Sequence, residues 1–189
     1  MTATGMRRLI ASAALAFATL ASIAAPAASA STGSSAVVTQ SASLPPGVTY
    51  DASVRPLAKP SASRQAKVNA VLQVAESKLG TPYVWGHNED RGQYGFDCSN
   101  FTAYVYHHAL GYKMSTSSRT QAKSVGRQVP VSQMQPGDLL IFNNGSHVGI
   151  YAGNGRMIQE GGGLGKVGYL SVAPGSYWGK HLTAVKRMF

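Results

Sequence analysis

The chain has 189 residues, of which 44% are hydrophobic, and this length and composition suit one globular domain with tails. The 17 Lys and Arg residues against 7 Asp and Glu give a formal charge of +10, which favours an anionic partner. The basic residues are scattered rather than clustered, so sequence-specific nucleic-acid binding is disfavoured.

The first 30 residues have the features of a secretory signal peptide. Residues 7 and 8 are Arg, residues 9–25 are uncharged and rich in Ala, and residues 28–30 (Ala-Ser-Ala) fit the small-x-small cleavage rule. The alternative is a membrane anchor, which the weakly hydrophobic Ala run and Pro26 disfavour. We therefore expect residues 1–30 to be removed on export, leaving no stable membrane span.

Residues 31–63 are rich in Ser, Ala, Thr and Pro and show little periodicity. This composition predicts a linker or flexible arm. Residues 48–57 can form a short extended piece lying on the domain, whereas the prolines around them argue against a helix. We place the folded domain at residues 64–189.

Within the domain, helical patterns come first and strand patterns follow. Apolar residues recur at helical spacing over 68–79 before Gly80, and a second helix is expected from Cys98 to about Leu110, with Asp97 as its N-cap. A shorter helix is expected at residues 118–124. Short apolar runs then predict strands at 129–131, 139–142, 147–152, 156–160, 166–172 and 182–188. This order indicates an α+β fold, with the helices packed on an antiparallel sheet of about five to six strands.

Cys98 is the single cysteine of the chain. An exported protein usually pairs its cysteines, so a lone one is left as a reactive thiol or an intermolecular linker. The alternative is a buried structural cysteine. We predict a nucleophile, because the N–H groups and dipole at a helix start favour the thiolate.

His147 is the preferred partner for this thiol among the five histidines. It opens an expected strand directly after a turn, so its ring should be reachable, although a strand-end histidine without a role is the alternative. His107 and His108 lie too far along the helix from Cys98, and we expect them to cap carbonyls or face solvent. His87, in a loop, stays a candidate, and His181 is expected at the surface.

Gln159 is the candidate for orienting His147. If residues 153–155 form a three-residue loop, we expect His147 to lie across from Gln159 on one face of the hairpin, where the amide oxygen can accept the imidazole proton. If the loop has only two residues, we expect Gln159 on the other face. The alternative for Gln159 is a solvent-facing strand residue.

Metal and phosphate sites are not expected. The sequence has no His-x-x-x-His motif and no cysteine pair, and its carboxylates are widely spaced. Residues 161–165 are rich in Gly but lack the following Lys-Ser/Thr of a phosphate loop. We therefore predict no cofactor and a mobile loop near the active face.

Five segments, in order, resemble the motifs of the NlpC/P60 cysteine peptidases. They are residues 80–86 (Gly-Thr-Pro-Tyr-Val-Trp-Gly), 96–99 (Phe-Asp-Cys-Ser), 135–139 (Gln-Pro-Gly-Asp-Leu), 147–151 (His-Val-Gly-Ile-Tyr) and 156–158 (Arg-Met-Ile). The resemblance extends over residues 64–189. It implies a papain-like α+β fold and cleavage of cell-wall peptides, typically after γ-D-glutamate.

The resemblance also implies a role for individual residues. Cys98 matches the nucleophile, His147 the base, and Gln159 the third, polar member of the triad, which is most often histidine in the family. Two further sets follow from the same motifs. Tyr83 matches a tyrosine lining the site, and Asp97 and Ser99 match positions that can hold the free amino end of a stem peptide. Asn100 replaces the glycine usual after Cys-Ser.

The function implied is that of a secreted peptidoglycan endopeptidase, extracellular or associated with the cell wall, that hydrolyses a stem-peptide amide bond by cysteine catalysis. Its expected partners are stem peptides and the anionic wall rather than nucleic acid, and we expect a monomer. Two alternatives stay open. The thioester can be transferred to an amine, as in a transpeptidase or transglutaminase, or Gln159 and Asn100 can mark a wall-binding protein that has lost activity.

Overall fold

The computed structural model describes residues 43–189. The expected signal peptide and residues 31–42 of the expected arm lie outside the described residues. The helices are α1 (Arg64–Ser77), α2 (Cys98–Leu110), α3 (Ser118–Ser124) and α4 (Tyr177–His181), with single 3-10 turns η1 (Glu89–Arg91), η2 (Val131–Gln133) and η3 (Asn143–Gly145). The strands are β1 (Val48–Tyr50), β2 (Tyr112–Met114), β3 (Arg127–Val129), β4 (Leu139–Phe142), β5 (His147–Gly153), β6 (Arg156–Gln159), β7 (Gly168–Ser171) and β8 (Leu182–Arg187).

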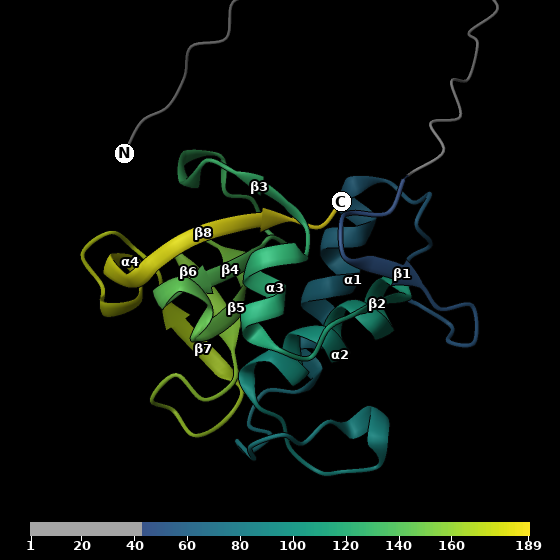
Figure 1. Cartoon of the computed structure of the whole chain (residues 1–189), viewed down its shortest axis with the longest axis horizontal. Helices are drawn as coiled ribbons and strands as arrows, with labels where there is room; N and C mark the ends of the chain where they lie inside the picture. The colour runs from purple at the N-terminus through teal and green to yellow at the C-terminus, as the bar shows by residue number, and fades with distance from the viewer. Residues whose placement is uncertain (1–42) are drawn as a thin grey trace, which may run out of the picture. The chain divides into compact units, whose positions relative to one another are not determined.

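Six strands form one antiparallel sheet in the order β3-β8-β4-β5-β6-β7. Helices α1 and α2 lie together beside this sheet, and α2 packs against β5 (Figure 1). The short strands β1 and β2 pair with each other outside the main sheet. The predicted α+β class, with helices on an antiparallel sheet, is confirmed.

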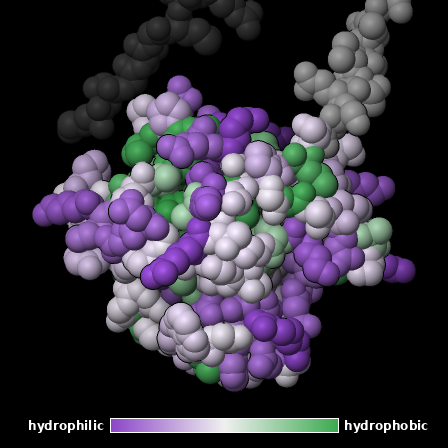
Figure 2. All heavy atoms as spheres, in the orientation of Figure 1, coloured by the Kyte–Doolittle hydropathy of each residue, from purple (hydrophilic) through white to green (hydrophobic). Residues whose placement is uncertain are grey.

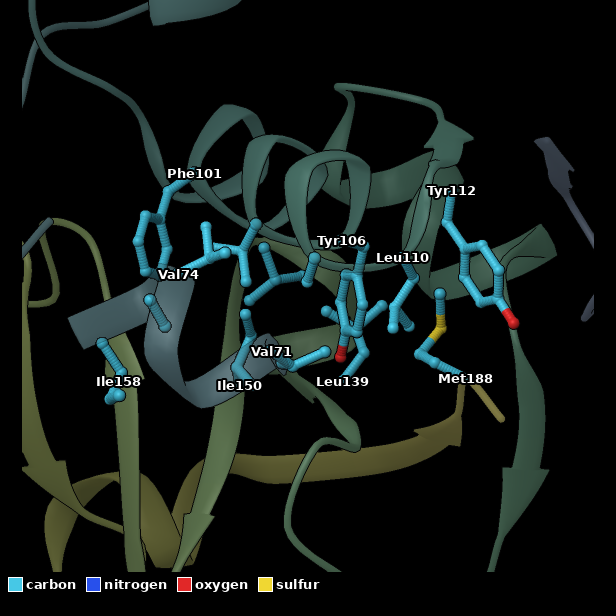
Figure 3. Packing of buried hydrophobic residues seen from close by; sticks show 14 of the residues in the cluster. Val71, Val74, Phe101, Tyr106, Leu110, Tyr112, Leu139, Ile150, Ile158 and Met188 are labelled. Atoms are coloured by element: carbon cyan, nitrogen blue, oxygen red, sulfur yellow. The ribbon is translucent and has the colours of Figure 1, made fainter. Parts of the chain in front are cut away.

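The main core fills the space between the two helices and the sheet. Val71 of α1 and the α2 residues Phe101 and Tyr106 meet Leu139 of β4 and Ile150 of β5 (Figure 3). All five side chains are fully buried, and each such burial is worth about 1.5–3 kcal/mol. This packing fixes α2 over β5 and so sets where the first turn of α2 lies.

Residues 43–63 are part of the packed unit, so the predicted boundary at residue 64 is too late. Strand β1 pairs with β2, and the backbone N–H groups of Asp51 and Ala58 donate to the carbonyls of Gly111 and Ala109, each at 2.9 Å. Composition indicated an arm because the segment has no apolar period. Its backbone groups instead satisfy carbonyls at the end of α2. The expected extended piece over residues 48–57 does lie on the domain, with β1 at its start.

Hydrophilic side chains and side chains of intermediate hydropathy cover most of the face shown in Figure 2, and the hydrophobic ones lie in separate patches. Within residues 43–189, no helix has both the length and the apolar character needed to cross a membrane.

Candidate active site

A cleft of about 740 Å³ opens between the start of α2, the start of β5 and the glycine-rich loop after β6. Cys98 and His147 both line it, so the structure brings the two predicted reactive residues to one place. Tyr83, Trp85, Asp97, Ser99 and Glu160 also line the cleft.

Cys98 is the first residue of α2, as predicted, and is partly buried. The backbone N–H groups of Val148 and Ser99 stabilise its thiolate. Burial nevertheless outweighs them and raises the pKa of the Cys98 thiol to about 11. The expected helix-start position is confirmed. Its backbone N–H groups lower the thiol pKa as expected, but desolvation is the larger effect.

His147 opens β5 and is 8% exposed. Its ring lies against Trp178, with centroids 4.5 Å apart, and near Phe142 at 5.9 Å. This apolar enclosure lowers the pKa of His147 to about 4, since burial disfavours the imidazolium. At neutral pH the imidazole is therefore unprotonated, which is the state a general base requires.

The predicted pairing of His147 with Gln159 is wrong: Gln159 lies opposite Gly149. Counting outward from an Ala152–Arg156 pair also gives Gly149 as the partner of Gln159. The hairpin has the two-residue loop Asn154-Gly155, with φ of 52° and 66°, as a type I′ turn requires. That loop was expected to turn Gln159 to the other face. An irregularity between Tyr151 and Gly153 adds one residue to β5 and returns Gln159 to the face of the hairpin that carries His147.

Gln159 consequently lies diagonally from His147, on the same side of the hairpin. It is fully buried, and it raises the pKa of His147 by favouring the protonated ring, against the larger effect of burial. Within the described residues, however, neither polar atom of its side chain nor His147 Nε2 meets hydrogen-bond geometry, so Gln159 acts on the ring as a neighbouring dipole rather than through a formed hydrogen bond. Gly149 makes the diagonal approach possible, because a Cβ there would lie 3.1 Å from Gln159 Cβ and 2.8 Å from Met157 Sδ.

Asp97 caps α2 and is held by protein groups on both oxygens. Oδ1 accepts hydrogen bonds from the backbone N–H groups of Ser99 (3.0 Å) and Asn100 (2.8 Å) and lies 2.9 Å from the Ser99 hydroxyl. Oδ2 accepts from the Gly86 N–H (3.0 Å) and from Asn100 Nδ2 (2.8 Å). A carboxylate has about four acceptor positions, and the protein groups named above already fill those of Asp97. Its contact with a substrate amino group stays a prediction, as does that of Ser99, whose hydroxyl also lies 2.7 Å from the Thr116 carbonyl.

The hydrogen bonds of its side chain account for Asn100 at a position where a glycine was expected. Its Oδ1 accepts from Arg91 Nη2 (2.7 Å) and from Asn88 Nδ2 (3.2 Å), while Arg91 also donates to the Gly86 carbonyl (3.0 Å). The side chain thereby joins the loop of residues 86–95 to the capped start of α2. A glycine at position 100 would leave these donors without that acceptor.

Aromatic side chains border the cleft. Tyr83, predicted to line the site, does so and packs its ring on Gly161. Trp85 is 80% exposed beside it. Trp178 of α4 covers His147.

Glu160 is a functional candidate that the sequence reasoning missed. It lines the cleft, is fully buried, and neither carboxylate oxygen has a partner among the described residues. Burial raises the pKa of Glu160 to about 7, and the charge of Asp97 adds to this effect. The nearby Gly161 N–H, which does not reach hydrogen-bond geometry, opposes it. Two features of the sequence could have indicated this residue. Glu160 directly follows Gln159, and it is the one acidic residue after Asp138.

We expect Glu160→Gln to stabilise the protein at pH 8 and to change little at pH 4. The pKa of Glu160 is higher in the folded protein than its ordinary 4.5, so its stabilising contribution is complete below pH 4.5 and is lost as pH rises through about 7. The gain at pH 8 should be about 2 kcal/mol, less than the full pKa shift implies, because Glu160, although it has no accessible surface, borders the cleft instead of lying deep in the core. Urea unfolding at both pH values measures it.

Glu89→Gln is the matched control for this experiment. Glu89 pairs with Lys78 at 2.5 Å near the surface, so its loss should slightly destabilise the protein at pH 8. Equal unfolding free energies for wild type and Glu160→Gln at pH 8 would contradict the expectation.

The remaining histidines lie outside the cleft. His87 Nδ1 contacts the Tyr94 carbonyl at 3.1 Å, and His181 Nδ1 contacts the Tyr177 carbonyl at 2.7 Å. His107 and His108 neither cap carbonyls nor stand free in solvent, because both contact Asp90.

Comparison with known proteins shows which family this chain belongs to. The model of the NlpC/P60 family matches residues 80–187. The chain is 39% identical over 132 residues to a probable endopeptidase p60 of Listeria grayi, covering 68% of the chain and 24% of that protein. It is 38% identical over 123 residues to a gamma-DL-glutamyl hydrolase of Bacillus subtilis, covering 62% and 28%. The chain thus spans about a quarter of the length of these relatives.

Solved structures show the same fold. The peptidoglycan hydrolase RipB from Mycobacterium tuberculosis superposes with a TM-score of 0.57 at 29% identity, covering 68% of this chain and 69% of that one. The NlpC/p60 domain of the peptidoglycan hydrolase SagA gives 0.55 at 32% identity, covering 64% and 98%.

Proposed function

The chain belongs to the NlpC/P60 family of peptidoglycan hydrolases, and from that premise we propose that it is an exported cysteine endopeptidase that hydrolyses a stem-peptide amide bond of the cell wall. One observation carries the proposal. Cys98, at the first turn of α2, and His147, at the start of β5, line the same cleft. The gamma-DL-glutamyl hydrolase among the relatives supports the bond after γ-D-glutamate as the one that is cut.

The pKa values indicate how the reaction starts. With the pKa of Cys98 near 11 and that of His147 near 4, both groups are neutral in the resting site. The imidazole therefore takes the thiol proton as the sulfur attacks the carbonyl carbon. The backbone N–H of Cys98, at the helix start, is the proposed donor to the oxyanion.

The later steps return every group to its starting state. His147 gives its proton to the leaving nitrogen, so the amide bond breaks and a thioester on Cys98 remains. A water molecule then loses a proton to His147 and attacks the thioester. Collapse of that intermediate releases the carboxylic acid, and the proton on His147 restores the thiol.

Sequence separation supports Gln159 as the third member of the triad. RipA has been solved with mutations at a cysteine, at a histidine 49 residues later, and at a glutamate 12 residues after that. Cys98, His147 and Gln159 have the same separations. In this chain an uncharged amide thus stands where RipA has a carboxylate, which fits the low pKa of His147.

We expect Gln159→Glu to move the acid limb of the pH–activity profile to higher pH by more than about one unit. A carboxylate beside the imidazole favours the imidazolium and therefore raises the pKa of His147. Gln159→Ala should lower kcat by about 10²-fold, since the ring loses its orienting group. Initial rates between pH 4 and 9 measure both effects, with the exposed Gln128→Ala as the control. Unchanged profiles and rates in both variants would remove Gln159 from the triad.

Digestion of purified peptidoglycan followed by mass spectrometry tests the proposed function. The expected products are stem-peptide fragments with a new carboxyl end at glutamate, and none from enzyme alkylated with iodoacetamide. Adding a primary amine separates hydrolysis from acyl transfer, because a transferase would place the amine on that carboxyl. Fragments from cleaved glycan strands alone, or no fragments, would overturn the proposal.

A further inference from the structure

Four titratable side chains meet at the end of α2 remote from Cys98. His107 Nδ1 lies 2.9 Å from Asp90 Oδ2, and its Nε2 lies 3.1 Å from Asp51 Oδ2. His108 Nε2 lies 2.5 Å from Asp90 Oδ1. The cluster joins three separate segments, namely the end of β1, the turn η1 and the last turn of α2.

His107 lies between two carboxylates. Its Nε2 faces Asp51 Oδ2 at 3.1 Å and its Nδ1 faces Asp90 Oδ2 at 2.9 Å. A ring with an acceptor in front of each nitrogen either holds a proton on both or binds a cation at one of them. The second arrangement is that of a metal-ligating histidine whose other nitrogen is held by a carboxylate.

The donor atoms are placed to share one ion. A carboxylate oxygen of Asp90, a ring nitrogen of His107 and one of His108 all lie within 4.8 Å of one another. Two imidazoles and one carboxylate with a further position for water are a frequent ligand set for zinc and neighbouring transition metals. Asp51, on the far nitrogen of His107, matches the supporting carboxylate that fixes the tautomer of a metal-bound histidine.

The cluster is accessible without being fully exposed. The Asp90, His107 and His108 side chains are 28%, 15% and 39% exposed. A separate cavity of about 400 Å³ adjoins Asp90 and His107 and offers a path for an ion. Arg91 and Lys113 also line that cavity, and their charges oppose a cation; the Arg91 guanidinium, however, is held by Asn100 and the Gly86 carbonyl.

We propose that Asp90, His107 and His108 bind one divalent transition-metal ion of the zinc class, with Asp51 as the supporting carboxylate. The ion replaces the direct contacts of Asp90 with both rings and ties η1 to α2. Because Arg91 follows Asp90 and holds Asn100, metal binding also steadies the loop that meets the Asp97 cap beside the cleft. The proposal does not depend on the proposed hydrolytic function. It revises the expectation of no metal site, which rested on spacing along the sequence.

Isothermal titration of the folded chain with ZnCl₂ tests the site. Cys98→Ala protein, dialysed against a chelator, is used so that the thiol cannot bind the metal. The expected result is one saturable zinc ion per chain and a higher melting temperature. The double variant His107→Gln/His108→Gln, in the same background, should bind at least tenfold more weakly, and Asp51→Asn about 10- to 100-fold more weakly.

Controls separate this result from loss of fold and from other histidines. His181→Gln in the same background should bind zinc as its parent does. Circular dichroism without metal verifies that the double variant folds, and the single variant His108→Gln replaces it if it does not. The proposal is overturned if no 1:1 binding is found, or if the folded histidine variants bind as tightly as their parent.

Discussion

Cys98→Ala protein is expected to release no stem-peptide fragments from purified peptidoglycan, a loss of at least about 10⁴-fold relative to wild type. The proposed reaction passes through a thioester on this sulfur, and alanine offers no atom that can attack. Without the nucleophile, only binding and oxyanion contacts remain. Mass spectrometry of the soluble fraction over a time course measures the loss.

The substitution should leave the fold intact, because it removes a single sulfur from a partly buried position at a helix start. Cys98→Ser is the closer control, since its hydroxyl restores a nucleophile of much lower reactivity beside His147. His181→Ala tests whether removing a histidine outside the cleft has any effect. Digestion by Cys98→Ala at the wild-type rate would exclude the thiol from catalysis.

Asp97→Ala is expected to destabilise the protein by about 3–4 kcal/mol and to abolish activity in whatever fraction stays folded. Loss of a helix N-cap costs about 0.5–2 kcal/mol by itself. Here the buried carboxylate also accepts hydrogen bonds from Gly86 and from the Asn100 side chain, and leaving such donors without partners adds about 1–3 kcal/mol. Urea unfolding at pH 7 measures the change.

Ser117→Ala provides the comparison for a simple cap. Ser117 caps α3 by accepting from the Thr120 N–H alone, so its loss should cost only about 1 kcal/mol. Asp97→Asn should fall between the two, because an amide can keep the cap at Oδ1 but presents a donor to Gly86 and Asn100. If Asp97→Ala costs no more than Ser117→Ala, then the ties to the loop contribute nothing to stability.

Much of the site was predictable because its signals are local. Asp97 before Cys98 predicts a helix start, and Gly111 predicts its end, since capping depends on neighbouring residues. His147 after a turn and before an apolar alternating run predicts a strand-end histidine. Ordered motifs then implied that Cys98 and His147 meet, and the structure places both on one cleft.

The β5–β6 hairpin shows why the register of strand pairing was harder to predict from the sequence. The sequence allowed either a two- or a three-residue loop, and each was expected to place Gln159 on a definite face. The actual strand combines the two-residue loop with an added residue near Ala152. A bulge depends on how two strands pack and twist together, so turn residues alone cannot report it.

The sequence by itself determined which chemistry this protein can carry: one thiol at a capped helix start, a histidine at a strand end and a polar residue on the following strand. Only the tertiary structure decided how those groups behave. Burial against Trp178 and Phe142 makes His147 neutral, and desolvation rather than the helix dipole dominates the pKa of Cys98. The reason is that the solvation of a group depends on what packs around it from distant parts of the chain. Local conformation, in contrast, depends largely on residues that are neighbours in the sequence.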